Sequence, residues 1–555
     1  MGKDKKRSDA VLIPAVNSAG QAVSVTPPGV RKWSRRKRRI WLTILALFLS
    51  FILLAAIFTY RRATATIRIG PDTTFITGPL KPDGTVDYAA AYNLTMGKGV
   101  TPKNNAAIPL LRIFGANKKV LGSHWRQILK EMHFTAGRRP VPHWVNFKKY
   151  LKQHPAENKE LLAAHMAPYL MYTRRLRKHA WHARQFPVYA AYLRYQAPAL
   201  RAIRHAVLRA KFFIPLPNIA LFDAPLPPGS EISYRAGRIL DVQAMLDVSR
   251  GRFSAALRDF SAARRLARLS PQGGRLVGYL ARTGVSNRIN AAAIALATNP
   301  RIHLPRSFYL RLLAQVAGHR GMHFAAVINY SQRMMALDVI TIVFRICHGH
   351  GPDWVPQHVS KGQANILLPA VIDWNWVLRW FNAMFNEETR IEEMRPRSAR
   401  FAAYHAFIMK RIRKHWKSTL LTDLQPTKAF RDDMLMDLMP DIEQAVFVSI
   451  TSRQRRRFAR VCIALALKHL ASGHFPRTLK DLVPKYLPAI PHDAFTGKAL
   501  EYRRTKTGYV LTCDWHSADA HLSKRRRGQL LVSYPEPPPK PLKPYTPPPP
   551  FHAGF

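Results

Sequence analysis

The most pronounced hydrophobic pattern in this chain is an unbroken apolar run that begins at Ile40, ends at Tyr60 and carries no charge. A helix needs about 20 apolar residues to cross a bilayer. Seven basic residues stand directly before the run: Arg31, Lys32, Arg35, Arg36, Lys37, Arg38 and Arg39. The pattern predicts a transmembrane helix. The positive-inside rule predicts a cytoplasmic N-terminus and a periplasmic location for the rest of the chain.

A cleaved signal peptide is the alternative to a retained anchor. Its charged leader would be much shorter than the 39 residues found here, and its apolar region would also be shorter. Arg61 and Arg62 follow the run directly, as residues at a membrane edge do. We therefore expect a retained, single-pass helix in a bacterial inner membrane. The mixed, Pro- and Gly-punctuated segment before it is predicted to be disordered.

Beyond this run, apolar positions recur mostly at three- and four-residue spacing, which is typical of packed helices. The sequence therefore predicts a mainly α protein with a helical, repeat-like exterior domain and a small C-terminal α+β module. Proline clusters and changes of periodicity set the boundaries. The predicted segments are 1–39 (cytoplasmic, basic), 40–60 (transmembrane), 61–83 (extended entry), 84–214 (first helical region), 215–229 (Pro-rich linker or long loop), 230–450 (second helical region), 451–515 (helix and two short strands) and 516–555 (basic, then a Pro-rich tail).

One stretch of the second helical region has a named periodicity. Gly251, Phe253, Ala256, Phe260 and Ala263 follow the spacing G-x-F-x-x-A-x-x-x-F-x-x-A, which is similar to a tetratricopeptide helix hairpin. In such a hairpin the small residues let two antiparallel helices approach, and the aromatic residues fill the gap between them. The pattern occurs once. Local core packing is therefore one interpretation, and a peptide-binding surface is the other.

The net charge of the chain limits the classes of partner that it would attract. The 555 residues include 87 Lys and Arg against 32 Asp and Glu, and the net charge is +55. Only 11 basic and two acidic residues precede Ile40, so the basic character belongs to the exterior part. Such a field attracts anionic lipid headgroups, acidic envelope polymers or nucleic acid. The predicted topology argues against nucleic acid, which leaves the lipid bilayer, protein partners and anionic envelope polymers.

Histidines suggest one weak metal-site candidate in a Gly- and Pro-rich stretch. The candidate ligands are Cys347, His348, His350, Asp353 and His358. Together they would supply the imidazole, thiolate and carboxylate donors that zinc accepts. Spacing of this kind suits a loop better than a helix face. Solvated or core side chains are the competing interpretation, and the sequence carries no motif for an organic cofactor.

Other candidate chemistry is weaker. His319 and His323 have i, i+4 spacing but lack the glutamate of H-E-x-x-H. Paired acids for glycan hydrolysis are offered by Glu387, Glu388, Glu392 and Glu393. In so basic a chain, we expect these acids to form ion pairs. The three cysteines are too few for a disulfide framework, and we expect buried thiols at Cys347, Cys462 and Cys513.

Near the C-terminus the residues resemble a known module. A helix from Arg457 leads into the run G-x-F-P-x-x-L-x-x-L-V-P-x-Y-L at 473–487, then P-x-D-x-F-x-G-x-x-L-x-Y at 491–502 and a strand pair ending at Leu511. These motifs are similar to the periplasmic part of type II secretion pseudopilins. The resemblance covers about 60 residues and implies a long helix packed on a small sheet. Nearly 400 residues separate this module from the membrane run, unlike the arrangement in pseudopilins.

A broader resemblance runs from about Thr73 to Leu511. It is carried by the segments 75–88 (FITGPLKPDGTVDY), 99–106 (GVTPKNNA) and 373–379 (DWNWVLR), together with the hairpin and the C-terminal module. In these segments the chain resembles a group of uncharacterised membrane-anchored proteins of planctomycete-type bacteria. That resemblance implies a bacterial envelope address and implies no activity.

These observations favour a non-enzymatic role. The leading hypothesis is a membrane-anchored scaffold or interaction protein of the bacterial envelope. An envelope hydrolase acting on wall or glycan polymers is one alternative, because catalytic residues can be arranged without a sequence motif. A secretion-associated component built on the pseudopilin-like module is the other.

Overall fold

The computed structural model describes residues 35–135, 142–163, 176, 179–217, 221, 228–269, 275–318, 324–348, 350, 371–394, 399–400, 402–404, 406–407, 409, 426–438, 440–514 and 529–535. The described chain is mainly helical with one small sheet, which confirms the predicted fold class. It divides into two compact units, Met1–Thr64 and Ala65–Phe555. The predicted disorder of the first segment concerns residues 1–34, which lie outside the described residues, and so does the Pro-rich tail from residue 536.

In the first unit, the described residues form one long helix, α1 (Arg35–Thr64). Its stretch Arg36–Arg61 is long and apolar enough to cross a membrane. Most of the large side chains from Ile40 to Tyr60 are exposed in the unit, and Phe58 is half-buried. The helix continues into the predicted extended segment and ends at Thr64. Its basic flanks and apolar centre are what the sequence pattern required.

The second unit contains the remaining helices. They are α2 (Tyr88–Met96), α3 (Ala107–Phe114), α4 (Lys118–Leu121), α5 (Trp125–Glu131), α6 (Phe147–Gln153), α7 (Pro155–Ala163), α9 (Pro187–Tyr195), α10 (Ala197–Ala206), α11 (Pro228–Ser249), α12 (Phe253–Leu269), α13 (Leu276–Thr298), α14 (Arg306–Ala317), α15 (Phe324–Ala326), the π-helical turn η2 (Val327–Gln332), α16 (Arg333–Cys347), α19 (Trp374–Glu393), α21 (Pro426–Leu438), α22 (Pro440–Ser472) and the 3-10 turn η3 (Leu479–Leu482).

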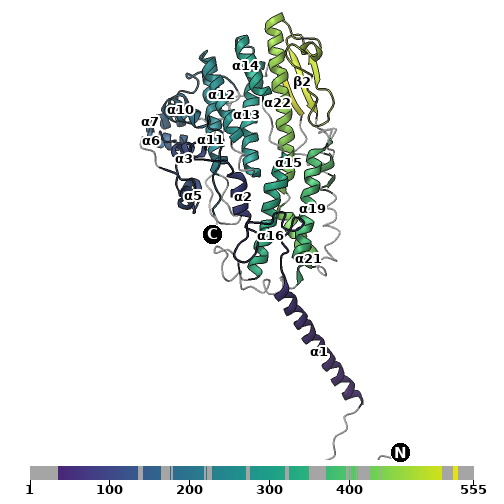
Figure 1. Ribbon diagram of the computed structural model, residues 1–555. Helices are drawn as coiled ribbons and strands as arrows, with labels where there is room; N and C mark the ends of the chain where they lie inside the picture. The colour runs from purple at the N-terminus through teal and green to yellow at the C-terminus, as the bar shows by residue number, and fades with distance from the viewer. Residues whose placement is uncertain are drawn as a thin grey trace, which may run out of the picture. The chain divides into compact units, whose positions relative to one another are not determined.

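The central helices of this unit pack side by side. Helices α11 and α12 form a hairpin, and α13, α14 and α22 continue the same layer (Figure 1). The facing side chains are small or aliphatic, and Ala263, Leu296 and Leu465 are fully buried. A second group, α15, η2, α16 and α19, packs together beside it. Small side chains at these contacts let neighbouring helices approach closely. The layer can therefore form without an internal sequence repeat.

The start of the second unit is fastened to α19 by two asparagines. Asn375 donates to the carbonyl of Thr66 at 2.8 Å and accepts from the amide of Arg68 at 2.7 Å. About two turns further along α19, Asn382 donates to the carbonyl of Thr73 at 2.5 Å. The side chains of asparagine can satisfy an extended backbone in this way because each offers a donor and an acceptor. The entry segment is therefore part of the body.

The described parts of the Pro-rich segment 215–229 pack onto the core. Asn93 bonds both backbone groups of Leu216 at 2.8 Å. The amide of Leu221 donates to the buried carboxylate of Asp338 at 2.6 Å. Leu216 and Leu221 are themselves buried. Helix α11 begins at Pro228, inside the range predicted as linker, because proline fits the first turn of a helix.

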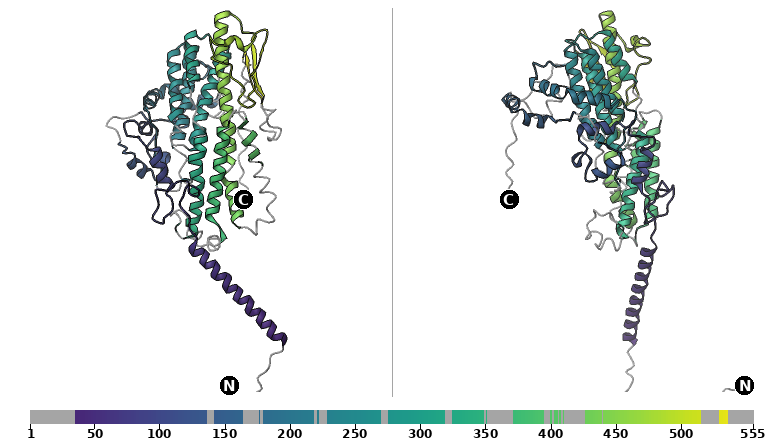
Figure 2. Two further views of the ribbon diagram at one scale, coloured as in Figure 1. Left: turned by 45° about the vertical axis from the view of Figure 1, so that its right-hand side comes forward. Right: turned by 60° about the vertical axis from the view of Figure 1, so that its left-hand side comes forward.

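The C-terminal module consists of α22, the turn η3 and a three-stranded antiparallel sheet in the order β1 (Glu501–Arg504), β2 (Tyr509–Asp514) and β3 (Gln529–Tyr534). Figure 2 shows the sheet beside α22. Tyr502 pairs with Leu511 and Tyr509 pairs with Tyr534. The sequence predicted the first two strands. The third strand, β3, lies in the range predicted as tail.

Asp493 organises the loop that precedes the sheet. Its carboxylate accepts from the amide of Phe495 at 2.7 Å and from the Cys513 thiol at 3.0 Å. Gln454 on α22 accepts from the amide of Ala494 at 2.7 Å, which joins the loop to the long helix. These contacts give a physical reason for the spacing P-x-D-x-F-x-G: the aspartate satisfies buried amides that no strand can pair.

Candidate functional site

The α11–α12 hairpin turns at Gly251, which has a φ of +70°. Glycine adopts this left-handed conformation without strain. Of the residues in the hairpin pattern, Ala256, Phe260 and Ala263 are fully buried. Phe253 is half-buried and packs edge-to-face on Phe308 of α14, with 5.6 Å between the ring centroids. The hairpin is thus held by its own small residues and by the next helices of the layer.

A groove of about 430 Å³ lies between this hairpin and the helices α9 and α10. Its apolar lining includes Leu193, Leu200 and Leu246. Its polar lining is dominated by six arginines against one aspartate: Arg194, Arg201, Arg204, Arg250, Arg252, Arg258 and Asp247. Among the described residues that line it, none is aromatic. Such a surface is concave, strongly positive and apolar at intervals, which is the composition of an anion-binding site rather than of a packed core.

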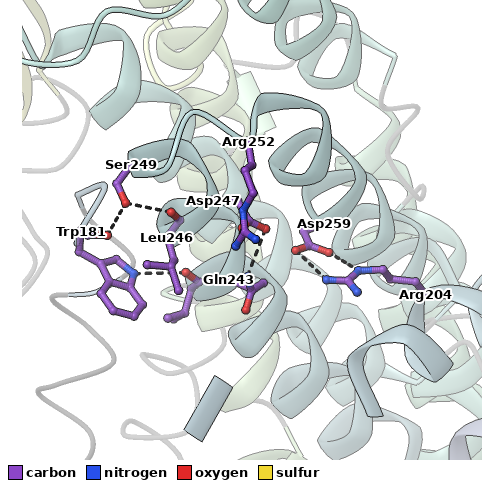
Figure 3. A network of polar contacts seen from close by, with 9 residues as sticks. Trp181, Arg204, Gln243, Leu246, Asp247, Ser249, Arg252 and Asp259 are labelled. Carbon is purple, nitrogen blue, oxygen red and sulfur yellow. Dashed lines mark hydrogen bonds and ion pairs between the residues drawn. The ribbon is translucent and has the colours of Figure 1, made fainter. Parts of the chain in front are cut away.

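Two aspartates hold two of these arginines in place, as Figure 3 shows. Asp247 lies 2.5 Å from a terminal nitrogen of Arg252 and accepts from Gln243 at 3.1 Å. Asp259 accepts from Arg204 through two bonds of 2.5 and 3.0 Å. The second pair is bidentate and joins α10 to α12. Paired arginines of this kind are fixed in direction and form the rigid rim of the groove.

The carboxylate of Asp259 is fully buried. Burial raises the pKa of Asp259 to about 6, although the hydrogen bonds and charge of Arg204 act in the opposite direction. Removing the carboxylate from water disfavours its ionised form, and one cation at its edge compensates only in part. The Arg204–Asp259 pair therefore weakens in mildly acidic solution.

Four other arginines of the groove have neither a hydrogen bond nor an ion pair to an acid in the part of the chain that the structure describes: Arg194, Arg201, Arg250 and Arg258. Burial and the nearby charge of Arg252 lower the pKa of Arg250. Burial is the larger cause of this shift, and repulsion between the guanidinium groups of Arg250 and Arg252 adds to it. An anion bound among them would relieve that repulsion and accept several charge-assisted hydrogen bonds.

A loop from the first helical region packs against α11. The indole of Trp181 donates to the carbonyl of Val242 at 3.2 Å, and Ser249 donates to the carbonyl of Trp181 at 2.6 Å. Figure 3 shows Trp181 beside the last turns of α11. Trp181 is fully buried, so the position of α11 relative to the first helical region is set by packing as well as by charge.

The predicted metal ligands are only partly described. Nδ1 of His348 lies 2.8 Å from the carbonyl of Phe344, and its ring packs on the Phe344 ring at 4.1 Å. His350 is exposed. His358 and Asp353 lie outside the described residues, as do His319 and His323. Among the residues that the structure describes, no group of three His, Cys, Asp or Glu side chains is placed to hold a metal ion.

Two of the four acids of α19, Glu387 and Glu392, form ion pairs of the kind expected for so basic a chain, and Glu388 accepts from the hydroxyl of Tyr404 at 3.4 Å. Glu387 lies 2.7 Å from Arg390 one turn away. Glu392 lies 3.2 Å from Arg400 and 3.9 Å from Arg453, and it is almost fully buried. Arginines on both sides of Glu392 supply the partners that a buried carboxylate needs. These contacts explain Glu387 and Glu392 as structural groups of α19.

Sequence reasoning did not single out the groove arginines. It assigned the basic character to the exterior part as a whole. A usable signal was present. Arg250, Arg252 and Arg258 flank the turn of the recognised hairpin, and Arg194 and Arg201 are two turns apart on α9 and α10. Their convergence depends on how the two regions pack.

Comparison with known proteins returned no matching family model, curated protein or solved structure. The resemblances to pseudopilins and to planctomycete-type membrane proteins therefore stay predictions. The geometry of the described residues carries the functional argument.

Proposed function

We propose that the protein is a membrane-anchored scaffold of the bacterial envelope that recruits partner proteins through acidic segments bound in the arginine-lined groove. The observation that carries this proposal is the groove itself, where six arginines face one aspartate between two helical regions. The tetratricopeptide-like hairpin α11–α12 supports it, because hairpins of this kind present their turns and faces to peptides.

The charge flanking α1 supports the proposed topology. Seven basic residues precede the apolar run, whereas Arg61, Arg62 and Arg68 follow it. This bias favours a cytoplasmic N-terminus and a periplasmic body. A reporter enzyme that is active only in the cytoplasm, fused after Phe555, should be inactive. An active reporter would overturn the orientation, and the envelope address with it.

The lining of the groove favours a peptide over nucleic acid. Single-stranded nucleic acids bind through aromatic side chains that stack on bases, and the groove lining holds none. Leu193, Leu200 and Leu246 would instead accept aliphatic side chains between the carboxylates of the partner. The preferred ligand is therefore an extended segment in which Glu or Asp alternates with Leu, Ile or Val.

A peptide of alternating Glu and Leu residues tests the proposal, with a Gln–Leu peptide of the same length as the uncharged control. The full-length protein in detergent micelles should bind the Glu–Leu peptide, and binding should weaken as salt rises because the contacts are charged. The double variant Arg250→Gln with Arg258→Gln should lose at least about tenfold in affinity, since two charge-assisted contacts are removed.

A matched control removes the same charge elsewhere. Arg503 and Arg504 are exposed on β1, far along the chain from the groove. The double variant Arg503→Gln with Arg504→Gln should bind the Glu–Leu peptide as the native protein does. Equal loss in both double variants would mean that net charge, and not the groove, attracts the peptide, and the proposal would fall.

A secretion-associated role is the second candidate, and one observation favours it. The long helix α22 lies beside a small antiparallel sheet, and Cys462 of α22 contacts Tyr509 of β2, which is the arrangement that the pseudopilin-like motifs imply. Here the module follows the helical body, so it would act as a docking element rather than as a pilus subunit. Consistent proximity of the gene to secretion-system genes would support this candidate, and its absence across related genomes would count against it.

A further inference from the structure

Asp259 is paired to the groove but is not itself among the described residues that line it. Its side chain is fully buried, whereas the side chain of Arg204 is 29% exposed and lines the groove. Arg204 donates to Asp259 from Nε at 2.5 Å and from Nη2 at 3.0 Å, as Figure 3 shows. Asp259 therefore acts on a ligand in the groove through Arg204 and not by direct contact.

The two bonds occupy one edge of the Arg204 guanidinium. A guanidinium offers five N–H donors, and an edge made by two neighbouring nitrogens pairs with a carboxylate through two parallel bonds. Asp259 takes that edge of Arg204. A carboxylate of a ligand must therefore compete with Asp259 for Arg204, and the negative charge of Asp259 also weakens the positive field of the groove.

The charged groups around Asp259 come from several helices. Those that act on it most strongly are Arg204 of α10, Asp247 of α11 and Arg258 of α12 itself. Helices α13 and α14 also pack against α12. The other described titratable groups on these helices are exposed (Arg201, His205, Arg235, Arg306 and Arg311) or engage other groups (Arg238 with Tyr234, Arg288 with Asp241, Arg282 with Arg268 and Arg456, Tyr279 with Ser449, and Tyr309 with the carbonyl of Leu296). A change in the charge of Asp259 is therefore felt first by Arg204.

We propose that Asp259 is a positioning residue whose protonation strengthens the binding of acidic segments in the groove. The inference rests on the proposed function of the groove and adds an acid response to it. A proton from solvent neutralises the carboxyl group of Asp259 and ends its ion pair with Arg204. The net charge beside the groove then rises by one, and the edge of Arg204 that Asp259 occupied becomes available to a carboxylate of the ligand.

The pKa of Asp259 places this change close to neutral pH. Burial raises the pKa of Asp259 to about 6, the charge of Asp247 acts in the same direction, and Arg204 and Arg258 act against it. The carboxylate holds Arg204 above this pH and the neutral carboxyl group releases it below, so affinity for an acidic segment should rise as pH falls. Binding free energies are reciprocal, so a bound segment also raises the pKa of Asp259, and the complex takes up protons as it forms.

The test measures the affinity of the full-length protein in detergent micelles for the Glu–Leu peptide, at constant ionic strength. The pH runs from about 7.5 to about 5.5, where the glutamates of the peptide stay largely ionised because the pKa of a free glutamate is about 4.3. We expect affinity to rise about fivefold toward the acid end, the order of effect of one unit charge beside a solvated groove. A flat profile with the peptide still bound would overturn the inference and leave the proposed function intact. If no peptide binds at any pH, the proposed function fails and the inference falls with it.

The variant Asp259→Asn fixes the neutral state, because the amide has almost the shape of the protonated carboxyl group. At neutral pH it should bind the peptide about as tightly as the native protein does at the acid end, and its affinity should not change over the interval. A variant that only loosened the fold would bind the peptide less tightly at every pH. Weaker binding by Asp259→Asn at neutral pH, or an unchanged slope, would contradict the role assigned to Asp259.

Proton uptake is a second measurement that a purely structural role of Asp259 would not change. Calorimetric titration at about pH 6, repeated in two buffers with different ionisation enthalpies, reports the protons taken up with each bound peptide. The native protein should take up a fraction of one proton, and Asp259→Asn should take up none. Binding by the native protein without proton uptake would contradict the coupling.

His205 supplies the matched control. Histidine is the other side-chain type that gains a charge in this pH range, and His205 is exposed directly after Arg204 on α10. The variant His205→Gln should keep the whole pH dependence of peptide binding. If His205→Gln flattens the profile and Asp259→Asn does not, the acid response belongs to the histidine and the inference is wrong.

Discussion

The α11–α12 hairpin and the C-terminal module use their few carboxylates in different ways. In the hairpin, Asp247 and Asp259 face arginines. In the module, Asp493 faces the backbone amide of Phe495 and the thiol of Cys513. The hairpin carboxylates lie among a surplus of guanidinium groups, whereas the module carboxylate meets neutral donors.

This difference separates a binding region from a structural one. Asp493 accepts from neutral donors, so it is satisfied without a cation. The loop of the module therefore needs no charged ligand to satisfy its hydrogen bonds. The groove beside the hairpin keeps four arginines without an acidic partner among the described residues, and that charge is available to a ligand. Changes in the module should therefore alter stability, and changes in the groove should alter binding.

The largest expected effect tests the packing of the hairpin. Phe260 is fully buried between the helices, so Phe260→Ala should lower the free energy of unfolding by about 3–5 kcal/mol through the cavity it leaves. Phe253 is half-buried and touches α14 at its edge, so Phe253→Ala should cost about 1–2 kcal/mol. Urea denaturation measures both. If the two variants lost the same free energy of unfolding, Phe260 would be no more important to the packing of the hairpin than Phe253.

A second prediction concerns the module. Asp493→Ala leaves the amide of Phe495 and the Cys513 thiol without an acceptor and should cost about 2–4 kcal/mol. Asp493→Asn keeps one acceptor oxygen and should cost less. Neither variant should change the affinity of the groove for the Glu–Leu peptide. A fall in that affinity would show that the two regions are coupled.

The third prediction is a dependence on pH. The pKa of Asp259 is about 6 in the folded protein and 3.8 without burial, so the folded state holds a proton that the unfolded state releases between these values. The free energy of unfolding should therefore fall as pH rises from about 4 to about 6, by at most about 3 kcal/mol. Asp259→Asn should flatten this part of the profile. A native profile that rises over the same interval would contradict the assignment.

The smallest effects come from two glycines with positive φ. Gly251 in the hairpin and Gly473 before the module have φ of +70° and +73°, with open space where a Cβ would stand. Replacement of either by Ala should cost about 1 kcal/mol through backbone strain alone. Gly284 lies inside α13 with open space as well, so Gly284→Ala should stabilise by about 0.5–1 kcal/mol. Thermal unfolding distinguishes the lower Tm expected for the Gly251 and Gly473 variants from the higher Tm expected for Gly284→Ala.

Much of the fold follows from local patterns in the sequence. The apolar run at Ile40–Tyr60 needs only composition to predict α1, and three- and four-residue spacing predicts the helix layer. The third strand was missed because Gln529–Tyr534 is six residues long and lies between a basic run and prolines. Its identity as a strand depends on pairing with β2, which no local signal reports.

The candidate site was less accessible to sequence reasoning. The spacing around Gly251 indicated a hairpin, but it did not indicate what faces the hairpin. Arg201 and Arg258 are 57 positions apart in the chain and line one groove only because α10 packs beside α12. Tertiary contacts also decide whether an arginine forms an ion pair with a carboxylate. Arg204 has one in Asp259, whereas Arg201, one turn away, has none among the described residues.

All three cysteines, Cys347, Cys462 and Cys513, are buried, and no disulfide joins them. Maturation of this chain therefore requires no thiol oxidation, and its fold is indifferent to the redox poise of the compartment that receives it. Buried thiols also react slowly with alkylating reagents. A single cysteine introduced at the rim of the groove would be the fast-reacting one, and a dye placed there would report occupancy directly.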